Sequence, residues 1–364
     1  MECNIDDDKV KVIMLLVTNS CNLNCVYCYE NHKKQNKMTI EVAKQSILSE
    51  IHDEKFDRYS IQFMGGEPLL SFSLIKELSE WIWESNIIEK PYELFGSTNG
   101  TCLTKEMKDW FYANRHRISF GLSIDGTPEV QNKNRSNSAR LIDFDFFLKT
   151  WPNLYFKMTI STYSIAHVYD SIVYLEEKGV KNIKADLAYM DGWNNEHLVI
   201  WEEQLDRLCE YYRTHECHCS LFDHHLEAIF AKDIRPKRCG CGEDIVCIDY
   251  DGEKYPCQMF SPISMETSVY EKVKDIDFSN MTYFSVKECQ GCILRALCPS
   301  CCGCNLKYNG SLNKVSAFYC KAFITNFLKT LKYRFIKAQE IEDIDLKNDT
   351  LNDLQEISRL LTIK

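Results

Sequence analysis

Six short apolar runs, each followed by a helical stretch, constrain the fold of this chain more than any other feature of its sequence. The runs are typical of buried strands and lie near residues 11–18, 59–64, 93–97, 117–124, 154–161 and 182–188. The helical stretches lie near 39–53, 72–86, 104–113, 138–149 and 164–178. Parallel strands need crossover connections, so this alternation predicts an α/β fold with a parallel sheet and helices on its outer face. The active site is then expected at the C-terminal ends of the strands.

The pattern changes after the sixth run. A polar helix near 197–214 is expected to bridge two domains, and residues 215–325 contain short hairpin-like pieces rich in Gly and Cys. We therefore expect a first domain over 1–196, the bridging helix over 197–214, a metal-held domain over 215–325, and a C-terminal helix and tail over 326–364. A basic amphipathic helix is expected near 321–340, with a polar tail from 341 that packs loosely or assists assembly.

Charge and hydropathy exclude several classes of protein. The chain has 364 residues, with 53 acidic and 43 basic side chains and a formal charge of −10, so nucleic acid is not expected as its main partner. Its longest early apolar run, Val12 to Val17, is far shorter than the roughly 20 residues that span a bilayer. The first residues are acidic and have no signal-peptide pattern. We expect a cytoplasmic protein without membrane spans.

Nineteen cysteines are distributed very unevenly. Five lie within the first 102 residues, none between 103 and 208, and fourteen between Cys209 and Cys320. Without a secretory signal, disulfides are less expected than metal binding by the clustered thiols.

Three of the cysteines share one loop directly after the first predicted strand. Cys21, Cys25 and Cys28 have the spacing C-x3-C-x2-C, and no fourth Cys is near in sequence. Three thiolates can hold three irons of a [4Fe–4S] cube and leave one iron open for a small chelating ligand. A zinc site or core thiols are the alternatives.

This loop resembles the cluster motif of the radical S-adenosylmethionine (SAM) enzymes, with Tyr27 as the aromatic residue before the third Cys. The resemblance implies a partial (β/α)6 TIM-like barrel. It also implies that the methionine group of SAM chelates the open iron and that an electron from the cluster cleaves SAM to a 5′-deoxyadenosyl radical. That radical abstracts a hydrogen atom from the substrate.

Later motifs extend the resemblance, each at the end of a predicted strand. Gly65, Gly66, Glu67 and Pro68 resemble the family's GGEP motif, which implies that Glu67 and backbone carbonyls hold the methionine amino group. A lone GGEP could be only a turn, but here it follows the second strand.

Polar residues after the third and fourth strands fit the same family. The segment 97–100 contains Asn99 and resembles the family's cofactor-lining segment, and Ser123 and Asp125 stand where the family contacts ribose or substrate. Arg135 resembles the arginine that pairs with the methionine carboxylate, a task suited to a planar donor. For Asn99, Ser123 and Arg135 taken singly, ordinary loop polarity is an equal alternative.

The C-terminal cysteines resemble the SPASM domain, an extension of radical SAM enzymes that modify peptides and proteins. The resemblance implies two further [4Fe–4S] clusters, hence three in all. It assigns one to Cys241, Cys247, Cys257 and Cys302, and the other to Cys289, Cys292, Cys298 and Cys320. Cys239 could replace Cys241, and Cys301 or Cys304 could compete with Cys302. A zinc ribbon is the alternative, but only five residues separate its two CxxC pairs.

The family match leaves the substrate open. We expect a peptide-modifying oxidoreductase that forms a thioether or carbon–carbon cross-link or a related modification on a ribosomal peptide. Formylglycine formation, as in anaerobic sulfatase maturases, is the alternative. Those enzymes usually carry Asp as a base after the Cys equivalent to Cys257, where this chain has Gln258; Asp191 and Asp249 are the candidate substitutes.

Partners follow from the same resemblance. We expect a peptide or protein substrate and an external one-electron donor of the flavodoxin or ferredoxin type. About ten residues precede the first strand, so a leader-binding domain is not expected in this chain and a separate leader-binding protein could supply that function. An iron–sulfur electron carrier and a zinc-held interaction module are the non-enzymatic alternatives.

The remaining cysteines have weaker claims to chemistry. Cys3, Cys102 and Cys209 are expected to be thiols without a chemical role. A denser group could bind metal, although no family motif covers it: Cys217, His218, Cys219, His224 and His225.

Overall fold

The computed structural model describes residues 9–231 and 234–362. The chain divides into two compact units, each built from segments that are distant in the sequence. The first comprises Met1–Ile124, Arg135–Phe156 and Cys239–Ser279, and the second comprises Asp125–Asn134, Lys157–Arg238 and Asn280–Lys364. This division differs from the predicted boundaries at 196, 214 and 325, because those boundaries followed changes in composition along the chain and not contacts in space.

A six-stranded sheet in the order β4-β3-β2-β1-β7-β8 forms the centre of the first unit. Its strands are β1 Val10–Thr18, β2 Arg58–Gly65, β3 Tyr92–Thr98, β4 Ile118–Leu122, β7 Ile245–Ile248 and β8 Lys254–Tyr255. Strands β1 to β4 pair in parallel, and Ile13, Leu15, Ile61 and Phe63 are fully buried. The expected α/β fold with parallel strands is thereby confirmed, and the loops after β1, β2 and β3 start at the same edge.

Strand β7 was not expected in this sheet. It comes from the Cys-rich segment, yet it pairs in parallel with β1, with Val12 opposite Ile245 and Leu15 opposite Ile248. Without β7, the backbone groups on that side of β1 would form an unpaired edge. Part of the segment 215–325, which was predicted to form a second domain, therefore contributes to the sheet of the first unit.

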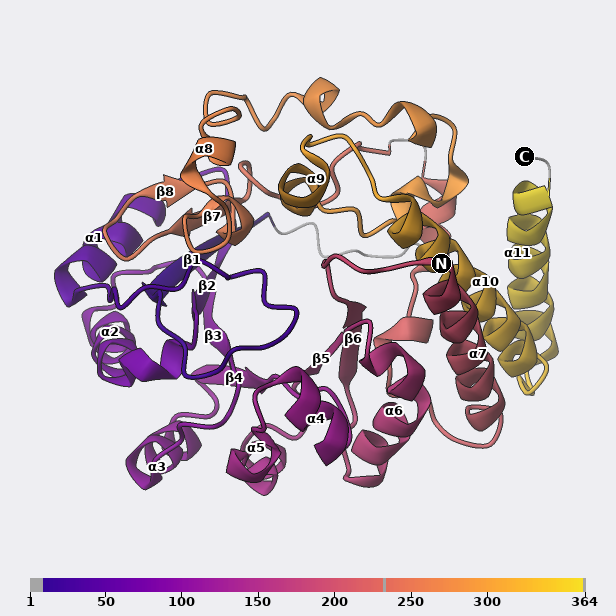
Figure 1. Ribbon diagram of the computed structural model, residues 1–364, viewed down its shortest axis with the longest axis horizontal. Helices are drawn as coiled ribbons and strands as arrows, with labels where there is room; N and C mark the ends of the chain where they lie inside the picture. The colour runs from indigo at the N-terminus through magenta and orange to yellow at the C-terminus, as the bar shows by residue number, and fades with distance from the viewer. Residues whose placement is uncertain (1–8, 232–233, 363–364) are drawn as a thin grey trace. The chain divides into compact units, whose positions relative to one another are not determined.

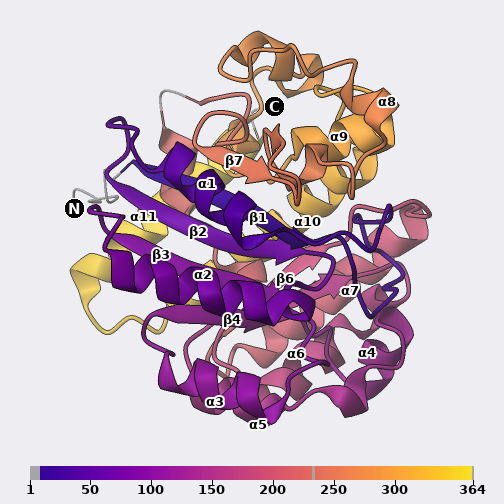
Figure 2. The same cartoon turned by 90° about the vertical axis from the view of Figure 1, so that its left-hand side faces the viewer.

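Helices cover the outer face of this sheet (Figure 2). They are α1 Ile40–Glu50, α2 Phe72–Ser85, α3 Lys105–Ala113 and α5 Phe144–Thr150, and a short α8 Thr267–Tyr270 follows β8. Thr39 caps α1 by accepting a hydrogen bond from the Val42 N–H. At the other end of α1, the buried Glu50 accepts hydrogen bonds from Lys11 of β1 and Lys254 of β8. One carboxylate thus ties a helix to two strands.

The second unit contains a separate two-stranded sheet of β5 Phe156–Ile160 and β6 Ile183–Leu187. Six strands in one continuous sheet were expected, whereas the six-stranded sheet takes four of them and adds β7 and β8. The helices of this unit are α4 Pro128–Asn134, α6 Val168–Glu177, α7 Asn195–Tyr211, α9 Cys302–Asn309, α10 Ala317–Ala338 and α11 Ile344–Thr362. Helix α4 was not predicted.

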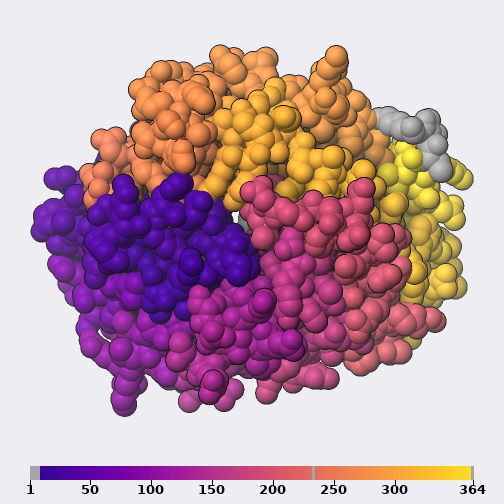
Figure 3. Space-filling model, viewed as in Figure 1, coloured from indigo at the N-terminus to yellow at the C-terminus, as the bar shows by residue number. Residues whose placement is uncertain are grey.

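Helices α7, α10 and α11 pack side by side (Figure 1). Trp201 of α7 is buried, and its Nε1 donates to the Ala322 carbonyl of α10 at 3.1 Å. Helix α7 therefore belongs to the core of one unit, whereas a polar bridge between domains was predicted. The tail is also packed more tightly than predicted, because Leu354 and Ile357 of α11 are buried in one cluster with Phe327 and Leu331 of α10. The C-terminal helices appear in yellow at the right of the space-filling view (Figure 3). None of the helices in the described residues is long and apolar enough to cross a membrane.

Candidate active site

The loop after β1 carries Cys21, Cys25 and Cys28, all partly buried. The Cys28 N–H donates to the Cys25 carbonyl at 3.2 Å, and the Leu23 N–H donates to the Cys21 sulfur at 3.4 Å. Burial raises the pKa of both Cys21 and Cys28, while the ammonium of Lys33 opposes this shift at both thiols. Lys33 also donates to the Leu23 carbonyl at 2.9 Å, so one cation holds the loop and favours its thiolates.

The glycines after β2 lie directly against this loop. A Cβ at Gly65 would be 2.0 Å from the Thr18 oxygen, and one at Gly66 would be 2.4 Å from the Ser20 oxygen and 2.9 Å from the Cys21 Cβ. Gly65 also has φ +138°, a conformation that side chains disfavour. Only glycine at these two positions lets the backbone approach the cysteine loop so closely. This fit supports a shared site for the cysteine loop and the GGEP segment.

Glu67 joins the ends of β2 and β3. Its side chain is 1% exposed, and its Oε1 accepts from Thr98 Oγ1 at 2.7 Å and from the Leu69 N–H at 3.1 Å, while Oε2 accepts from the Asn99 N–H at 2.8 Å. Burial raises the pKa of this carboxyl, and the three donors and Arg135 oppose the rise. A carboxylate has about four acceptor positions, so about one remains for a ligand. Glu67 therefore holds the ends of β2 and β3 together, because the protein itself uses most of its acceptor positions. The predicted contact with the methionine amino group stays a prediction.

Pro68 begins the turn that follows Glu67, Pro68–Ser71, where its fixed φ suits the first position. Asn99 lies on the next loop, and its Nδ2 donates to Asn22 Oδ1 at 2.9 Å. The backbone of Ser123 donates to the Thr98 carbonyl at 2.8 Å. These contacts bring Asn99 beside the cysteine loop. They also place Ser123 next to Thr98, which donates a hydrogen bond to Glu67, in the order that the motifs have in the sequence.

Arg135 lies in the loop that follows α4 and is 7% exposed. Its guanidinium is 5.3 Å from the centre of the Tyr27 ring, and its charge lowers the pKa of both Cys28 and Glu67. Ser136, the next residue, has φ +55°, and its Oγ accepts from the Asn24 N–H at 2.9 Å. The structure thus brings the predicted arginine to the cysteine loop and fixes it there.

Asp125 differs from its prediction. It is fully buried, and its carboxylate accepts from the Thr159 N–H and from Asn134 Nδ2, both at 3.0 Å. These bonds connect β5 with α4 inside the second unit. A fully buried carboxylate cannot contact ribose or substrate without a rearrangement, so the structure supports a structural role.

Three of the predicted C-terminal ligands belong to the first unit. Cys241, Cys247 and Cys257 are buried, and the Cys257 thiol contributes to raising the pKa of Cys247, after burial itself. Gly252 lies in the turn between β7 and β8 with φ +92°, and its N–H donates to the Asp249 carbonyl at 2.9 Å. Glycine suits this position, because the turn needs a positive φ. Cys302 belongs to the second unit, so its grouping with these three stays a prediction.

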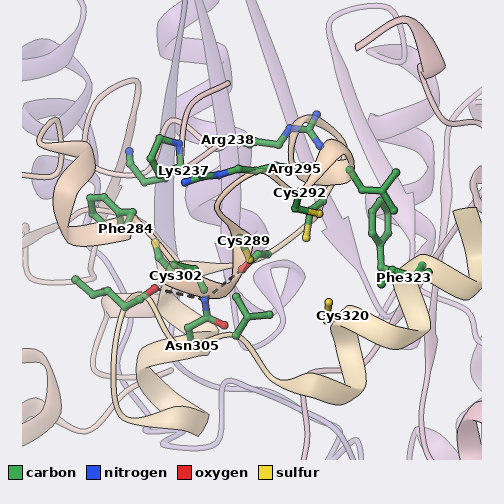
Figure 4. Close-up of a pocket in the computed structure, with 18 residues that line it drawn as sticks. Lys237, Arg238, Phe284, Cys289, Cys292, Arg295, Cys302, Asn305, Cys320 and Phe323 are labelled. Atoms are coloured by element: carbon green, nitrogen blue, oxygen red, sulfur yellow. Dashed lines mark hydrogen bonds between the residues drawn. The ribbon is translucent and has the colours of Figure 1, made fainter. Parts of the chain in front are cut away.

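The other four predicted ligands line one pocket of the second unit (Figure 4). They are Cys289, Cys292, Cys298 and Cys320. After burial, the pKa of Cys298 is raised by the other three thiols, which places all four within electrostatic reach of one another. Cys302 lines the same pocket beside Asn305.

A single tetrahedral zinc ion would need four sulfurs about 2.3 Å from it, and such sulfurs lie roughly 3.8 Å apart. Among the described residues, no three His, Cys, Asp or Glu side chains are grouped as ligands of a single metal ion.

The weaker cysteine candidates lie apart from the cysteine loop and the C-terminal ligands in the sequence. Burial raises the pKa of Cys102 to about 12 and the pKa values of Cys209 and Cys217 to about 11. In the group over 217–225, His224 Nε2 forms a hydrogen bond with Asn326 Oδ1 at 2.8 Å. Cys3 lies outside the described residues.

Comparisons with known proteins find relatives in sequence and in fold. The cysteine-type anaerobic sulfatase-maturating enzyme of Clostridium perfringens is 24% identical over 351 residues, which cover 84% of this chain and 92% of that protein. The solved structure of native anSMEcpe with bound AdoMet and Cp18Cys peptide has a TM-score of 0.65 at 21% identity and covers 94% of this chain and 99% of that chain. Streptococcus suis SuiB bound to the precursor peptide SuiA has a TM-score of 0.59 at 15% identity, covering 85% and 76%. The two structures share the fold.

The family model of the Radical SAM superfamily matches residues 15–205. This range contains the cysteine loop after β1, the glycines clamped against it, Glu67 and Arg135. The chain therefore belongs to the radical SAM superfamily.

Proposed function

We propose that this protein is a radical SAM oxidoreductase that modifies a side chain of a peptide or protein. One observation carries the proposal: Cys21 of the three-cysteine loop lies against Gly66, while Arg135 and Glu67 lie within electrostatic reach of one another. When bound, a [4Fe–4S] cluster and SAM supply a 5′-deoxyadenosyl radical that takes a hydrogen atom from the substrate. Cys21, Cys25 and Cys28 would hold that cluster.

The chain's own residues bind and orient the cofactor. Arg135 is suited to the methionine carboxylate because its planar guanidinium can donate two parallel hydrogen bonds. The last acceptor position of Glu67 is suited to the methionine amino group. Asn99 and Ser123 are suited to bind polar groups elsewhere on the cofactor. Because Arg135 and Glu67 are almost fully buried, both interactions take place with little screening by water.

We also propose two auxiliary [4Fe–4S] clusters, as in SPASM domains. The shared pocket of the second unit supports the set Cys289, Cys292, Cys298 and Cys320. Burial of Cys241, Cys247 and Cys257 near β7 and β8 supports the other set, with Cys302 as its fourth member. Such clusters fit a net oxidation, and an external flavodoxin- or ferredoxin-type donor would supply the electron for SAM cleavage.

Cross-linking of a peptide is favoured over formylglycine formation. Gln258 follows Cys257, and its Oε1 is buried without a hydrogen-bond partner among the described residues. An amide cannot take up a proton at neutral pH. Of the possible substitutes, Asp249 is buried, and its Oδ1 accepts hydrogen bonds from Asn19 Nδ2 and from the Tyr250 N–H. A peptide substrate agrees with the peptides in the anSMEcpe and SuiB structures.

The remaining partners belong to the same proposal. We propose a cytoplasmic enzyme whose substrate's leader sequence, if it has one, is bound by a separate protein. An iron–sulfur electron carrier is disfavoured, because a carrier needs neither a three-cysteine loop nor the polar groups clamped beside it.

The test is release of 5′-deoxyadenosine from SAM by the anaerobically reconstituted, dithionite-reduced protein. We expect Cys28→Ala to abolish release while leaving the iron of the auxiliary clusters bound. Cys102→Ala is the matched control, because it removes a nearby thiol that is not a proposed ligand, and it should keep the parental rate. Release by Cys28→Ala at the parental rate would overturn the site assignment.

A further inference from the structure

The two-stranded sheet of the second unit has one buried face and one charged face. The buried side chains alternate along both strands: Phe156, Met158, Ile160, Ile183 and Ala185. Successive side chains of a strand point to opposite faces of its sheet. The residues between the buried ones therefore share the other face, which carries Lys157, Thr159, Lys184 and Asp186. Lys184 and Asp186 are exposed, and Lys157 is partly buried.

The three charged residues Lys157, Lys184 and Asp186, here called the β5–β6 charge cluster, lie within electrostatic reach of one another. Burial lowers the pKa of Lys157, the charge of Lys184 lowers it further, and the charge of Asp186 opposes both. Burial raises the pKa of Asp186, and both lysines oppose the rise. Asp186 is nevertheless exposed to water. Protein atoms thus surround a position that solvent still reaches, as in a hollow of the surface.

The β5–β6 charge cluster lacks the pairing found elsewhere in the chain. Glu50 of α1, for comparison, accepts hydrogen bonds from two lysines. Among the described residues, no side-chain hydrogen bond and no ion pair within 4.0 Å involves Lys157, Lys184 or Asp186. Two like charges side by side on one face of a sheet repel one another. The sheet therefore keeps two ammonium groups together without an anion bound between them.

Resting on the proposed function, we propose that the β5–β6 charge cluster binds a carboxylate of the peptide substrate. Lys157 and Lys184 donate to its oxygens, because an ammonium group only donates and a carboxylate has about four acceptor positions. Both lysines lie three residues before the last residue of their strands, and α/β folds bind ligands at these C-terminal ends.

The charge of the cluster fits a carboxylate better than a phosphate group. Two ammonium groups and the carboxylate of Asp186 leave one positive charge. One carboxylate of the peptide neutralises that charge, whereas a phosphate group, with a charge of about −1.5 to −2, would leave an excess of negative charge. The cluster thereby selects acidic peptides over their amide analogues.

The test is peptide binding to the anaerobically reconstituted full-length protein with SAM and without reductant, measured by fluorescence anisotropy. The probe is a short labelled peptide of Gly, Cys and Glu with an amidated C-terminus, compared with the same peptide carrying Gln in place of Glu. We expect the Glu peptide to bind about tenfold more tightly. A third peptide, with Gln and a free C-terminus, distinguishes the two sources of the carboxylate. It binds as tightly as the Glu peptide if the cluster takes a chain end, and as weakly as the Gln peptide if it takes a side chain.

Variants separate the cluster from the general charge of the protein. Lys184→Gln, at an exposed position, should reduce the affinity for the Glu peptide to that for the Gln peptide, and Lys157→Gln carries the same expectation at a partly buried position. Asp186→Asn should instead strengthen binding of the Glu peptide several-fold, because it removes the anion that competes for the lysines. A merely structural role of Asp186 would weaken binding. Lys181→Gln, which removes an exposed lysine close in sequence to β6, should leave both affinities unchanged.

Two results would overturn the inference: equal binding of the Glu and amidated Gln peptides to the parent, or an undiminished preference for Glu in folded Lys184→Gln. Release of 5′-deoxyadenosine by the reduced parent without peptide tests the proposed function separately. If release occurs and the Glu peptide has no advantage, the inference alone fails. If no release occurs, the proposed function fails at its own test.

Discussion

At the scale of single residues, the cofactor site depends most on the carboxylate of Glu67. Three hydrogen bonds from Thr98, Leu69 and Asn99 fix it, so its orientation is set before any ligand binds. The sequence motif predicts its presence in the site. The motif does not predict that most of its acceptor positions are used by the protein, because two of the three partners, Thr98 and Asn99, come from the end of β3 and the loop after it.

We predict that Glu67→Gln weakens SAM binding about tenfold or more. The amide places a donor against the N–H of Asn99 or against Thr98, and a buried unsatisfied donor costs about 1–3 kcal/mol. Equilibrium dialysis of SAM with the reconstituted protein measures the effect. Glu93→Gln is the control, because Glu93 also accepts a hydrogen bond within the sheet, from Ser60, but is exposed. A parental Kd in Glu67→Gln would contradict the positioning role.

Asp125 and Arg135 show what a motif can and cannot specify. Both were predicted to be site residues from their order after β4, and only Arg135 lies beside the cysteine loop. Asp125 turns inward because the Thr159 N–H and Asn134 offer hydrogen bonds there. Sequence order places a residue on a loop, but the direction of its side chain depends on partners contributed by distant segments.

At the scale of elements, hydrophobic periodicity predicted most strands and helices, and pairing across long distances decided the rest. The run near 59–64 became β2 Arg58–Gly65, since a buried parallel strand needs a continuous apolar segment. Helix α4 was missed because Pro128–Asn134 contains a single strongly apolar residue, Val130. Helix α11 was underestimated because its polar composition obscured the helical spacing of Leu354 and Ile357.

Helix α1 also carries a pH-dependent contact. Burial raises the pKa of Glu50, but hydrogen bonds from Lys11 and Lys254 outweigh it and leave the pKa below its ordinary value of 4.5. A lowered pKa in the folded state stabilises the protein above the ordinary pKa, and this stability is lost as the pH falls through the lowered value. The contact therefore contributes fully at pH 7 and weakens only below about pH 4.5.

We predict that Glu50→Gln lowers the free energy of unfolding by about 3 kcal/mol at pH 7, because it leaves the mostly buried Lys11 with only the more distant carboxylate of Asp53, at 4.0 Å. Urea unfolding at pH 7, 5 and 3.5 measures the effect. The difference between parent and variant should be constant from pH 7 to 5 and shrink at pH 3.5. A difference that grows as the pH falls would contradict the sign of this coupling.

At the scale of the whole molecule, each compact unit collects segments from distant parts of the chain. The sheet of the first unit is completed only when Val12 of β1 pairs with Ile245 of β7. Composition along the chain cannot reveal such a unit, which is why the predicted domain boundaries differ from the structure.

A chain ending at Arg238 should therefore not fold stably, although it contains the residues matched by the family model. It lacks β7 and leaves one side of β1 without hydrogen bonds. We expect this truncated chain to aggregate and to show no cooperative thermal transition in circular dichroism, unlike the full chain. A monomeric truncated chain with a cooperative transition would show that β7 is dispensable.

The pairing of β1 with β7 also has a consequence during synthesis. When the first strand leaves the ribosome, the strand that will cover its open edge has not yet been translated, and more than two hundred residues separate the two. Contacts so distant along the chain slow folding and prolong the time for which the unpaired edge of β1 is exposed to aggregation. Slower translation at low temperature and chaperone capacity in the host should thus govern the yield of this protein as strongly as its supply of iron and sulfide.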